Sequence, residues 1–152
     1  MNPVGIRNTI DLDSSSESES KTDILNIDSD FLTIRTLVDR VYDQLGYGLS
    51  ESSYRKALCS ELELEYDCVE EEYGVGLDYV NRAFKTKQIA TLRLDIYIDR
   101  KIVLELKTLS KNLVDSDSTK EIQQLLRYKQ ITSSEKGFLI NFGKKEYQIF
   151  QK

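Results

Sequence analysis

The stretch that decides the fold is residues 92–107, LRLDIYIDRKIVLELK. Apolar and polar side chains alternate along it, which is typical of β-strands that bury one face. Residues 99–101 are polar and divide it into two strands, which we expect to pair as an antiparallel hairpin. Pairing Ile98 with Ile102 keeps apolar residues opposite one another, whereas a slip of one residue would not. The residues expected on one face are Leu92, Leu94, Ile96 and Ile98, and those on the other are Arg93, Asp95 and Tyr97.

This register brings two carboxylates together. Asp95 lies opposite Glu105, with Cβ atoms about 5 Å apart, and Lys107 projects from the same face. Like charges in such a position repel, and a divalent cation such as Mg²⁺, which prefers carboxylate oxygens, would offset the repulsion. Alternatively, Arg93 and Lys107 neutralise the two acids in a solvated surface cluster. The spacing alone leaves both interpretations open.

Two helices are expected ahead of the hairpin. Residues 30–45 place apolar side chains at steps of three and four, with Ser29 or Asp30 as the N-cap. A second helix from Ser50 to about Leu64 carries Glu51 at its start, on a largely apolar side. Glu51 could complement the helix dipole, which is worth about 0.3 to 1 kcal/mol, or it could belong to an acidic site.

The rest of the domain combines strands with one further helix. Residues 69–75 are expected to form a strand, with a turn or bulge at Gly74 and Gly76. The remaining elements are a helix over residues 118–131, capped by Ser118 or Thr119, and strands over residues 137–141 and 147–150. This order predicts an α+β fold, with a mixed central sheet flanked by helices.

The first 30 residues differ from the rest in composition. They hold seven acidic and two basic residues, which accounts for the net charge of −5, whereas residues 31–152 contain 19 of each. Residues 11–21, DLDSSSESESK, have too little apolar surface to offset chain entropy. We therefore expect residues 1–30 to form a disordered acidic tail and residues 31–152 to form the folded domain.

Two aliphatic clusters beside acids in this tail resemble SUMO-interacting motifs, which add a strand to an exposed sheet edge. Their aliphatic residues are Ile10 and Leu12 in the first cluster and Ile24, Leu25 and Ile27 in the second. Under this interpretation the partner is SUMO or a SUMO-modified protein. Alternatively, the second cluster docks on the domain ahead of the first helix.

Composition excludes several kinds of chemistry. The chain has no histidine, so catalysis would depend on carboxylates, Lys, Tyr or a thiol, and His-ligated zinc is ruled out. Two cysteines, Cys59 and Cys68, are too few for a disulfide scaffold or a zinc cage, and we expect both thiols to be buried and reduced. Because no apolar run reaches the roughly 18 residues of a membrane span and no signal peptide is recognised, we expect an intracellular protein, nuclear or cytoplasmic, without a membrane partner.

Four segments with fixed spacing occur in order along the domain. They are Gly48-Leu-Ser-Glu51-Ser-Ser-Tyr54, Leu94-Asp95 followed by Glu105-Leu106-Lys107, Gln124-Leu-Leu-Arg-Tyr128, and Gly137-Phe-Leu-Ile-Asn-Phe-Gly143. Together they resemble the GxxExxY family of the PD-(D/E)XK nuclease superfamily, and the third is similar to the QxxxY helix motif of RecB-like members. The resemblance covers about residues 31–150 and implies an α/β/α-type, restriction-endonuclease-like core. Leu94 replaces the superfamily's leading Pro, and the stretch before Asp95 is longer and less regular than usual.

The resemblance also implies roles for individual residues. Asp95, Glu105 and the Leu106 backbone carbonyl would bind Mg²⁺ or Mn²⁺. Lys107 would orient or activate the attacking water, and Glu51 would complete the acidic, metal-binding site.

The helix motif and the basic residues would contact the substrate. Gln124 would present an amide to the catalytic lysine or the phosphate, and Tyr128 a phenol, although ordinary packing explains Tyr128 equally well. The candidate contacts to nucleic acid are Tyr128, Arg55, Lys56, Arg82, Lys85, Lys87, Arg93, Lys120, Arg127 and Lys129. Alternatively, each basic residue taken singly is a solvated surface charge.

The activity that the resemblance implies is hydrolysis of phosphodiester bonds in nucleic acid by a metal-activated water, with DNA as the expected substrate. The alternative is a catalytically weak or inactive adaptor that keeps the nuclease fold, binds nucleic acid or protein, and is recruited through the SUMO-interacting motifs. The neutral charge and small size of the domain favour a weak binder or a homodimer that pools two surfaces. Selectivity for structure or ends rather than sequence is expected, because no base-reading module is recognised.

Overall fold

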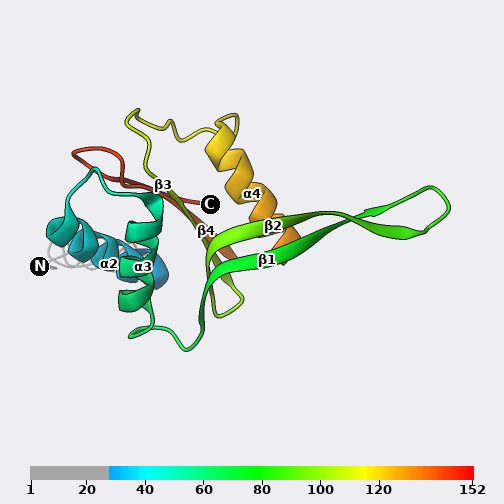
Figure 1. Cartoon of the computed structure of the whole chain (residues 1–152), viewed down its shortest axis with the longest axis horizontal. Coiled ribbons are helices and arrows are strands. Elements are labelled where there is room, and N and C mark those ends of the chain that lie inside the picture. The colour runs from blue at the N-terminus through cyan, green and yellow to red at the C-terminus, as the bar shows by residue number, and fades with distance from the viewer. Residues whose placement is uncertain (1–27) are drawn as a thin grey trace, which may run out of the picture. The chain divides into compact units, whose positions relative to one another are not determined.

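The computed structural model describes residues 28–152, which form three α-helices and five β-strands (Figure 1). The helices are α2 (Ser29–Leu45), α3 (Glu51–Leu62) and α4 (Lys120–Thr132). The strands are β1 (Val69–Val80), β2 (Thr86–Ile98), β3 (Ile102–Lys107), β4 (Lys136–Asn141) and β5 (Gln148–Gln151). Residues 1–27, with most of the expected tail and both expected SUMO-interacting motifs, lie outside the described residues. In the part of the chain that the structure describes, each helix is too short or too polar to cross a membrane.

The chain divides into two units within helix α2, between Thr33 and Ile34. In the first unit, Asp28 Oδ1 accepts hydrogen bonds from the backbone N–H groups of Asp30 (2.9 Å) and Phe31 (3.1 Å). The N-cap is therefore Asp28, not Ser29 or Asp30 as predicted, because a carboxylate just ahead of the first turn reaches its free amides. In the second unit the predicted apolar face is confirmed, since its buried members are Ile34, Leu37, Val38 and Val41.

The five strands form one mixed sheet in the order β1-β2-β3-β4-β5. Neighbouring strands are antiparallel except β3 and β4, which are parallel and are connected through α4. A parallel pair needs such a crossover because both strands start at the same edge of the sheet. The predicted α+β class, with a mixed sheet flanked by helices, is confirmed.

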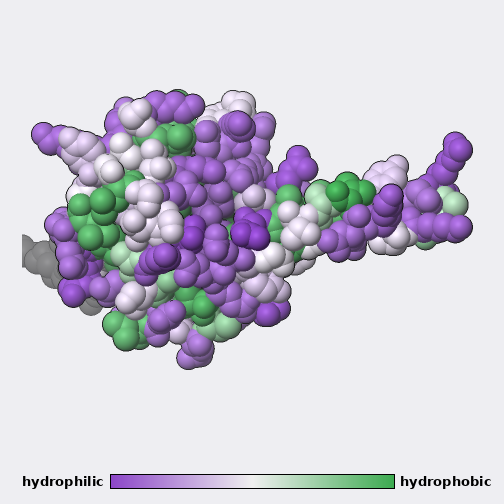
Figure 2. Space-filling view, in the orientation of Figure 1, coloured by the Kyte–Doolittle hydropathy of each residue, from purple (hydrophilic) through white to green (hydrophobic). Residues whose placement is uncertain are grey.

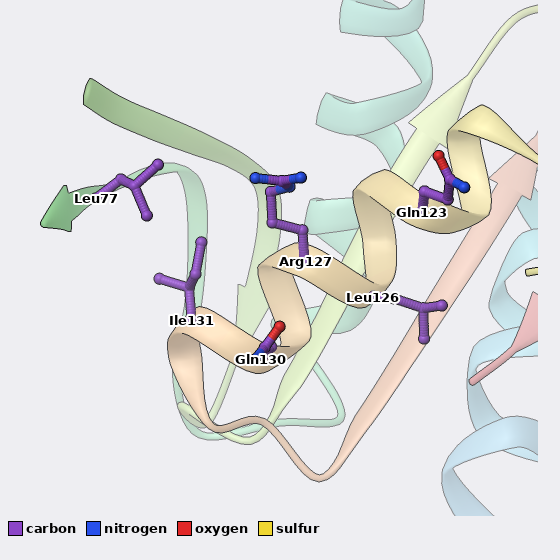
Figure 3. A pocket seen from close by; sticks show the side chains of 6 residues that line it. All are labelled: Leu77, Gln123, Leu126, Arg127, Gln130 and Ile131. Atoms are coloured by element: carbon purple, nitrogen blue, oxygen red, sulfur yellow. The ribbon is translucent and has the colours of Figure 1, made fainter. Parts of the chain in front are cut away.

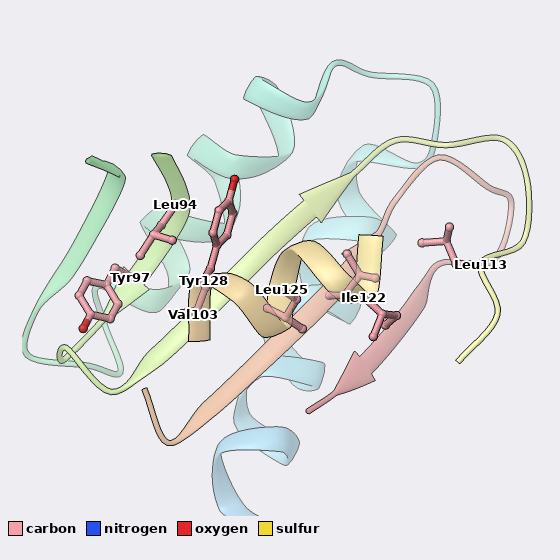
Figure 4. Packing of buried hydrophobic residues seen from close by; sticks show 8 residues of the cluster. Leu94, Tyr97, Val103, Leu113, Ile122, Leu125 and Tyr128 are labelled. Atoms are coloured by element: carbon pink, nitrogen blue, oxygen red, sulfur yellow. The ribbon is translucent and has the colours of Figure 1, made fainter. Parts of the chain in front are cut away.

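Helices cover both faces of this sheet. On one face α4 packs on Val103 and Leu139, and Figure 4 shows the buried side chains between the helix and the strands. On the other face lies α3, as Figure 1 shows. Its buried Tyr54 stacks on Phe142, with ring centroids 4.5 Å apart and the rings 2° from parallel. The core therefore consists of two apolar layers, one packed on each face of the central strands.

The hairpin of β2 and β3 has the predicted register, but only near its turn. Ile98 pairs with Ile102 as expected, and the ladder covers three residue pairs before it ends at Ile96. Asp95 is therefore not paired with Glu105 across the sheet, and the expected continuation of the ladder is wrong. Beyond Ile96, β1 is the only strand of residues 28–152 that pairs with β2. The two strands thus fork at Asp95.

The fork also changes which way the side chains of β2 face. The sequence predicts Leu94 and Tyr97 on opposite faces, but both belong to the buried cluster under α4. Leu92 packs against the same cluster. The predicted strict alternation therefore does not hold between Leu94 and Tyr97, the segment in which the ladder to β3 ends.

Strand β1 is longer than predicted. A strand ending at Val75 and a turn or bulge at Gly74 and Gly76 were the expectation, but β1 runs through both glycines to Val80. Neither glycine has a positive φ, so neither makes a turn. The register shift lies just beyond them, between Leu77 and Asp78.

The outer ends of β1 and β2 project from the sheet as a two-stranded arm (Figure 1). We use "the arm" for residues 78–91, all of which are exposed. Strand β2 begins at Thr86, six residues ahead of Leu92, where the alternating stretch quoted from the sequence starts. Exposure on both faces removes the apolar alternation by which a strand is recognised from sequence.

Candidate functional site

A short loop fixes the start of α3, where Glu51 is the first helical residue. Ser50 is the N-cap, as predicted, and its Oγ accepts a hydrogen bond from the Ser53 N–H at 3.2 Å. The buried Tyr54 hydroxyl donates to the Gly46 carbonyl at 2.6 Å and so ties the loop to the helix. Gly48 has φ +102°, a left-handed conformation that suits glycine. The glycine and tyrosine of the first motif therefore hold the backbone from which Glu51 extends.

Asp95 lies at the fork between β2 and β3. Its Oδ2 accepts a hydrogen bond from the Leu106 backbone N–H at 2.7 Å, in place of the backbone ladder that has ended. Burial raises the pKa of the Asp95 carboxyl, and the Leu106 amide partly offsets that rise. The fork thus places one carboxylate against the strand that carries the next two site residues.

Glu105 is the most deeply buried acid of the site, at 3% exposure. Its Oε1 lies 3.2 Å from Lys107 Nζ. Its Oε2 is buried and, among the side-chain oxygens and nitrogens buried within residues 28–152, it alone has no hydrogen-bond partner. Burial, reinforced by the charge of Asp95, raises the pKa of Glu105 to about 8. A buried carboxylate oxygen without a partner costs free energy unless a proton or a cation satisfies it.

Lys107 and Glu51 complete this cluster. Burial alone would lower the pKa of the Lys107 ammonium, but the carboxylates of Glu105, Glu51 and Asp95 raise it. Burial, followed by the charge of Asp95, raises the pKa of Glu51 as well. The four groups therefore act on one another electrostatically although they come from α3, β2 and β3. We call Glu51, Asp95, Glu105 and Lys107 the acidic cluster.

The acidic cluster is not a closed metal cage as it stands. Within residues 28–152, no three Asp, Glu or Cys side chains lie close enough together to hold a metal ion. Two of the carboxylates are instead turned to neighbours, Asp95 to the Leu106 amide and Glu105 Oε1 to Lys107. The chemistry of the donors still suits a hard cation, because they are carboxylate oxygens and one of them is buried without a partner.

The loop after Lys107 is anchored by Asn141, whose role the sequence did not reveal. Asn141 is fully buried, accepts from the Leu109 N–H at 2.9 Å and donates to the Leu109 carbonyl at 3.0 Å. A Cβ on Gly143 would lie 2.3 Å from the carbonyl carbon of Thr108, so only glycine allows this approach. The signal that could have found Asn141 is its position as an amide inside the apolar run FLINF.

Helix α4 carries the other motif residues beside Lys107. Gln124 Nε2 donates to the Tyr128 hydroxyl at 2.8 Å, and Tyr128 is buried in the cluster under α4. A cavity of about 600 Å³ is bounded by Lys107 from the sheet and by Gln124, Arg127 and Tyr128 from α4. The helix motif therefore borders the lysine of the acidic cluster.

The predicted contacts to nucleic acid are not gathered on one surface patch. Arg55 is 11% exposed in its side chain and is paired with Glu71 Oε1 at 2.8 Å, so it faces acids rather than solvent. Arg93 is 71% exposed and lies 3.9 Å from Glu72 Oε1. Other predicted contacts are exposed on separate elements: Lys56 on α3, Lys120 and Arg127 on α4, and Arg82, Lys85 and Lys87 on the arm.

The two thiols differ in environment. Cys59 is buried as expected, and burial raises the pKa of its thiol to about 12. Cys68 is exposed, so the prediction of a second buried thiol is wrong. It precedes β1 directly, outside the apolar face of α3 that buries Cys59.

One known family has a model that matches this chain. The model described as PD-(D/E)XK nuclease superfamily matches residues 30–152. A comparison with curated proteins finds no match. Among solved structures, "Crystal structure of SSO0001" is similar to this chain at 21% identity, with a TM-score of 0.42, over 77% of this chain and 75% of that one.

Proposed function

Because the chain belongs to the PD-(D/E)XK nuclease superfamily over residues 30–152, we propose that it is a metal-dependent nuclease that hydrolyses phosphodiester bonds, with DNA as its substrate. Within that superfamily we assign it to the GxxExxY family. Gly48, Glu51 and Tyr54 support this assignment, because the glycine and the tyrosine both shape the loop that precedes Glu51.

The single observation that carries the proposal is the orphan oxygen of Glu105. Its Oε2 is buried without a hydrogen-bond partner among the described residues, beside an Asp and a Lys that act on it electrostatically. In the cation-bound protein, Asp95, Glu105, Glu51 and the Leu106 carbonyl would hold Mg²⁺ or Mn²⁺. When bound, such a cation lowers the pKa of water and neutralises charge that builds up on a phosphate.

The other residues of the site support hydrolysis directly. The Lys107 ammonium is held by Glu105 at 3.2 Å, so it is fixed in position to donate to an attacking water or to a phosphate oxygen. Gln124 and Tyr128 are already hydrogen-bonded to each other and line the cavity that reaches Lys107. We assign them to holding the phosphate or the lysine during the reaction.

The described residues give no reason to favour an inactive adaptor. An adaptor could replace the buried Glu105 with an apolar residue and gain stability, since an unsatisfied buried carboxylate is destabilising. The chain instead keeps the acid and its lysine. Retention of a costly group is typical of catalytic sites.

Cleavage assays with matched variants test the proposal. Purified protein is incubated with DNA and, separately, RNA in the presence of Mg²⁺, Mn²⁺ or a chelator. We expect cleavage of DNA that requires the cation and is abolished by Asp95→Asn. Asp67→Asn, which changes an exposed acid outside the cluster, is the control and should cleave like the wild type. Cleavage that survives both the chelator and Asp95→Asn would refute the proposal.

A further inference from the structure

The arm is more than a connection between two strands. Beyond Ile96, β2 no longer pairs with β3, so the arm buries none of the core and residues 78–91 are all exposed. A connection between β1 and β2 could be made by two residues at the edge of the sheet. The extra length therefore needs a reason outside folding.

The tip of the arm is ordered and strained. The Asn81 side chain accepts hydrogen bonds from the N–H groups of Ala83 (2.9 Å) and Lys85 (3.0 Å), which fixes the turn. Phe84 has φ +60°, a left-handed conformation that a bulky residue avoids, and it is 90% exposed. A strained, solvent-exposed aromatic residue gains nothing from packing in this chain, and such outliers cluster at sites of binding.

The arm is basic although the domain as a whole is not. It carries Arg82, Lys85 and Lys87 against one acid, Asp78. None of the three cations forms an ion pair with another residue of 28–152. Figure 2 shows hydrophilic side chains along the arm and over its tip, with smaller hydrophobic patches between them. This composition suits a polyanion with flat apolar groups, which describes nucleic acid.

One side of the arm continues into the surface that leads to the acidic cluster. Leu77, at the base of the arm, borders a cavity together with Arg127 and Ile131 of α4 (Figure 3). Arg127 also borders the cavity that reaches Lys107. Beyond the register shift that follows Leu77, Tyr79 of β1 pairs with Lys87 of β2, so an aromatic and a basic residue lie opposite each other on the arm. Arg127 therefore borders both the cavity at the base of the arm and the cavity that reaches Lys107 of the acidic cluster.

The dimensions of the arm select the form of nucleic acid. A two-stranded β-ribbon fits the major groove of B-form DNA, whereas the major groove of an RNA duplex is too deep and narrow. Asp95 lies nine positions after Thr86 on β2, so at about 3.3 Å per residue the start of β2, next to the tip, lies up to roughly 30 Å from the carboxylate. That reach is close to one helical turn of DNA, about 34 Å.

We propose that the arm is a DNA-duplex grip: it lies in the major groove about one turn from the scissile phosphate, with Arg82, Lys85 and Lys87 on backbone phosphates and Phe84 against the bases. The inference rests on the proposed function, which it deepens by naming duplex DNA as the substrate. The arm contacts and the hydrolysis are separate steps, so each can fail without the other.

Binding measured without cleavage tests the grip. Fluorescent DNA duplex of about three helical turns, the matching single strand and the matching RNA duplex are titrated into the Glu105→Gln protein at several salt concentrations. Lys85→Gln/Lys87→Gln should weaken duplex-DNA binding about 10-fold and lower the slope of log affinity against log salt by about 2. Phe84→Ala should weaken it about 5-fold. Lys101→Gln/Lys145→Gln, which removes two exposed lysines away from the arm, should change it less than about 2-fold.

Each contrary outcome is decisive. Unchanged duplex binding in the arm variants, or equal losses for the single strand or the RNA duplex, would overturn the assignment to a DNA duplex. A change of oligomeric state in either arm variant, measured by light scattering, would show instead that the arm joins two copies of this chain. Arm-dependent duplex binding in a wild-type protein that does not cleave would overturn the proposed function and leave the grip standing.

Discussion

Replacing Glu105 with glutamine should stabilise the cation-free protein at alkaline pH. Burial and the charge of Asp95 raise the pKa of Glu105 from 4.5 to about 8. Between these values the folded state holds a proton that the unfolded state has lost, so stability falls as the pH rises through this window. At about 1.36 kcal/mol per pKa unit, the free energy of unfolding is lowered by at most about 5 kcal/mol above pH 8.

The expected gain is smaller than that upper limit. The glutamine amide is still buried with polar atoms that lack partners, which costs about 1 to 3 kcal/mol. We therefore expect Glu105→Gln to raise the free energy of unfolding by about 2 to 4 kcal/mol at pH 8.5. At pH 5, where the wild-type carboxyl keeps its proton, the same amide cost applies almost without the ionisation gain, so the variant should be about 0 to 2 kcal/mol less stable than the wild type.

Urea unfolding in the presence of a chelator measures this difference, followed by circular dichroism because the chain has no Trp. Added Mg²⁺ at about ten times its dissociation constant should stabilise the wild type by about 1.4 kcal/mol and the variant by nothing measurable. Glu135→Gln, which changes an exposed acid, is the control and should follow the wild type under every condition. Equal pH dependence in wild type and Glu105→Gln, or equal stabilisation of both by Mg²⁺, would refute the reasoning.

Three further substitutions have expected outcomes. Lys107→Met should lower the single-turnover rate of DNA cleavage about 10²- to 10³-fold while the protein still binds DNA in a titration, because the fixed ammonium would act on the reacting phosphate. Tyr54→Phe should lower the free energy of unfolding in urea by about 1 to 2 kcal/mol, because it removes the hydrogen bond from the Tyr54 hydroxyl to the Gly46 carbonyl at 2.6 Å. Tyr47→Phe, at a 59% exposed site, is the control and should have little effect. Gly143→Ala should lower the free energy of unfolding by more than about 3 kcal/mol or prevent folding, because the added methyl would lie 2.3 Å from the backbone carbonyl carbon of Thr108. Gly74→Ala is the control: its added methyl would lie 3.6 Å from its nearest neighbour, so this variant should fold normally in a thermal-unfolding assay.

The strands near the hairpin turn were predictable because their register depends on local pattern. Ile98 and Ile102 are separated by a short polar stretch, and only one parity keeps both buried. The fork at Asp95 was not predictable, since it depends on a hydrogen bond from the Leu106 amide to a side chain. Alternation continues through Asp95 in the sequence and gives no sign that the ladder ends there.

The site shows the same contrast. The spacing of Glu105 and Lys107 placed them on one side of β3, and the structure joins them at 3.2 Å. Arg55 was expected to contact nucleic acid because it is basic. Its pairing with Glu71 depends on how α3 lies against β1, a contact between elements that periodicity cannot reveal.

The arm also has a consequence for how the protein behaves at high concentration. Among the described residues, β1 is an edge of the sheet and β2 has no second neighbouring strand beyond Ile96, so there each strand of the arm has an open edge. Open edges of this length template ordered aggregation unless charged residues interrupt them. The charges of Asp78 and Lys87 lie within these strands and oppose such aggregation, so apolar, β-branched replacements there should make the protein more prone to form fibrils.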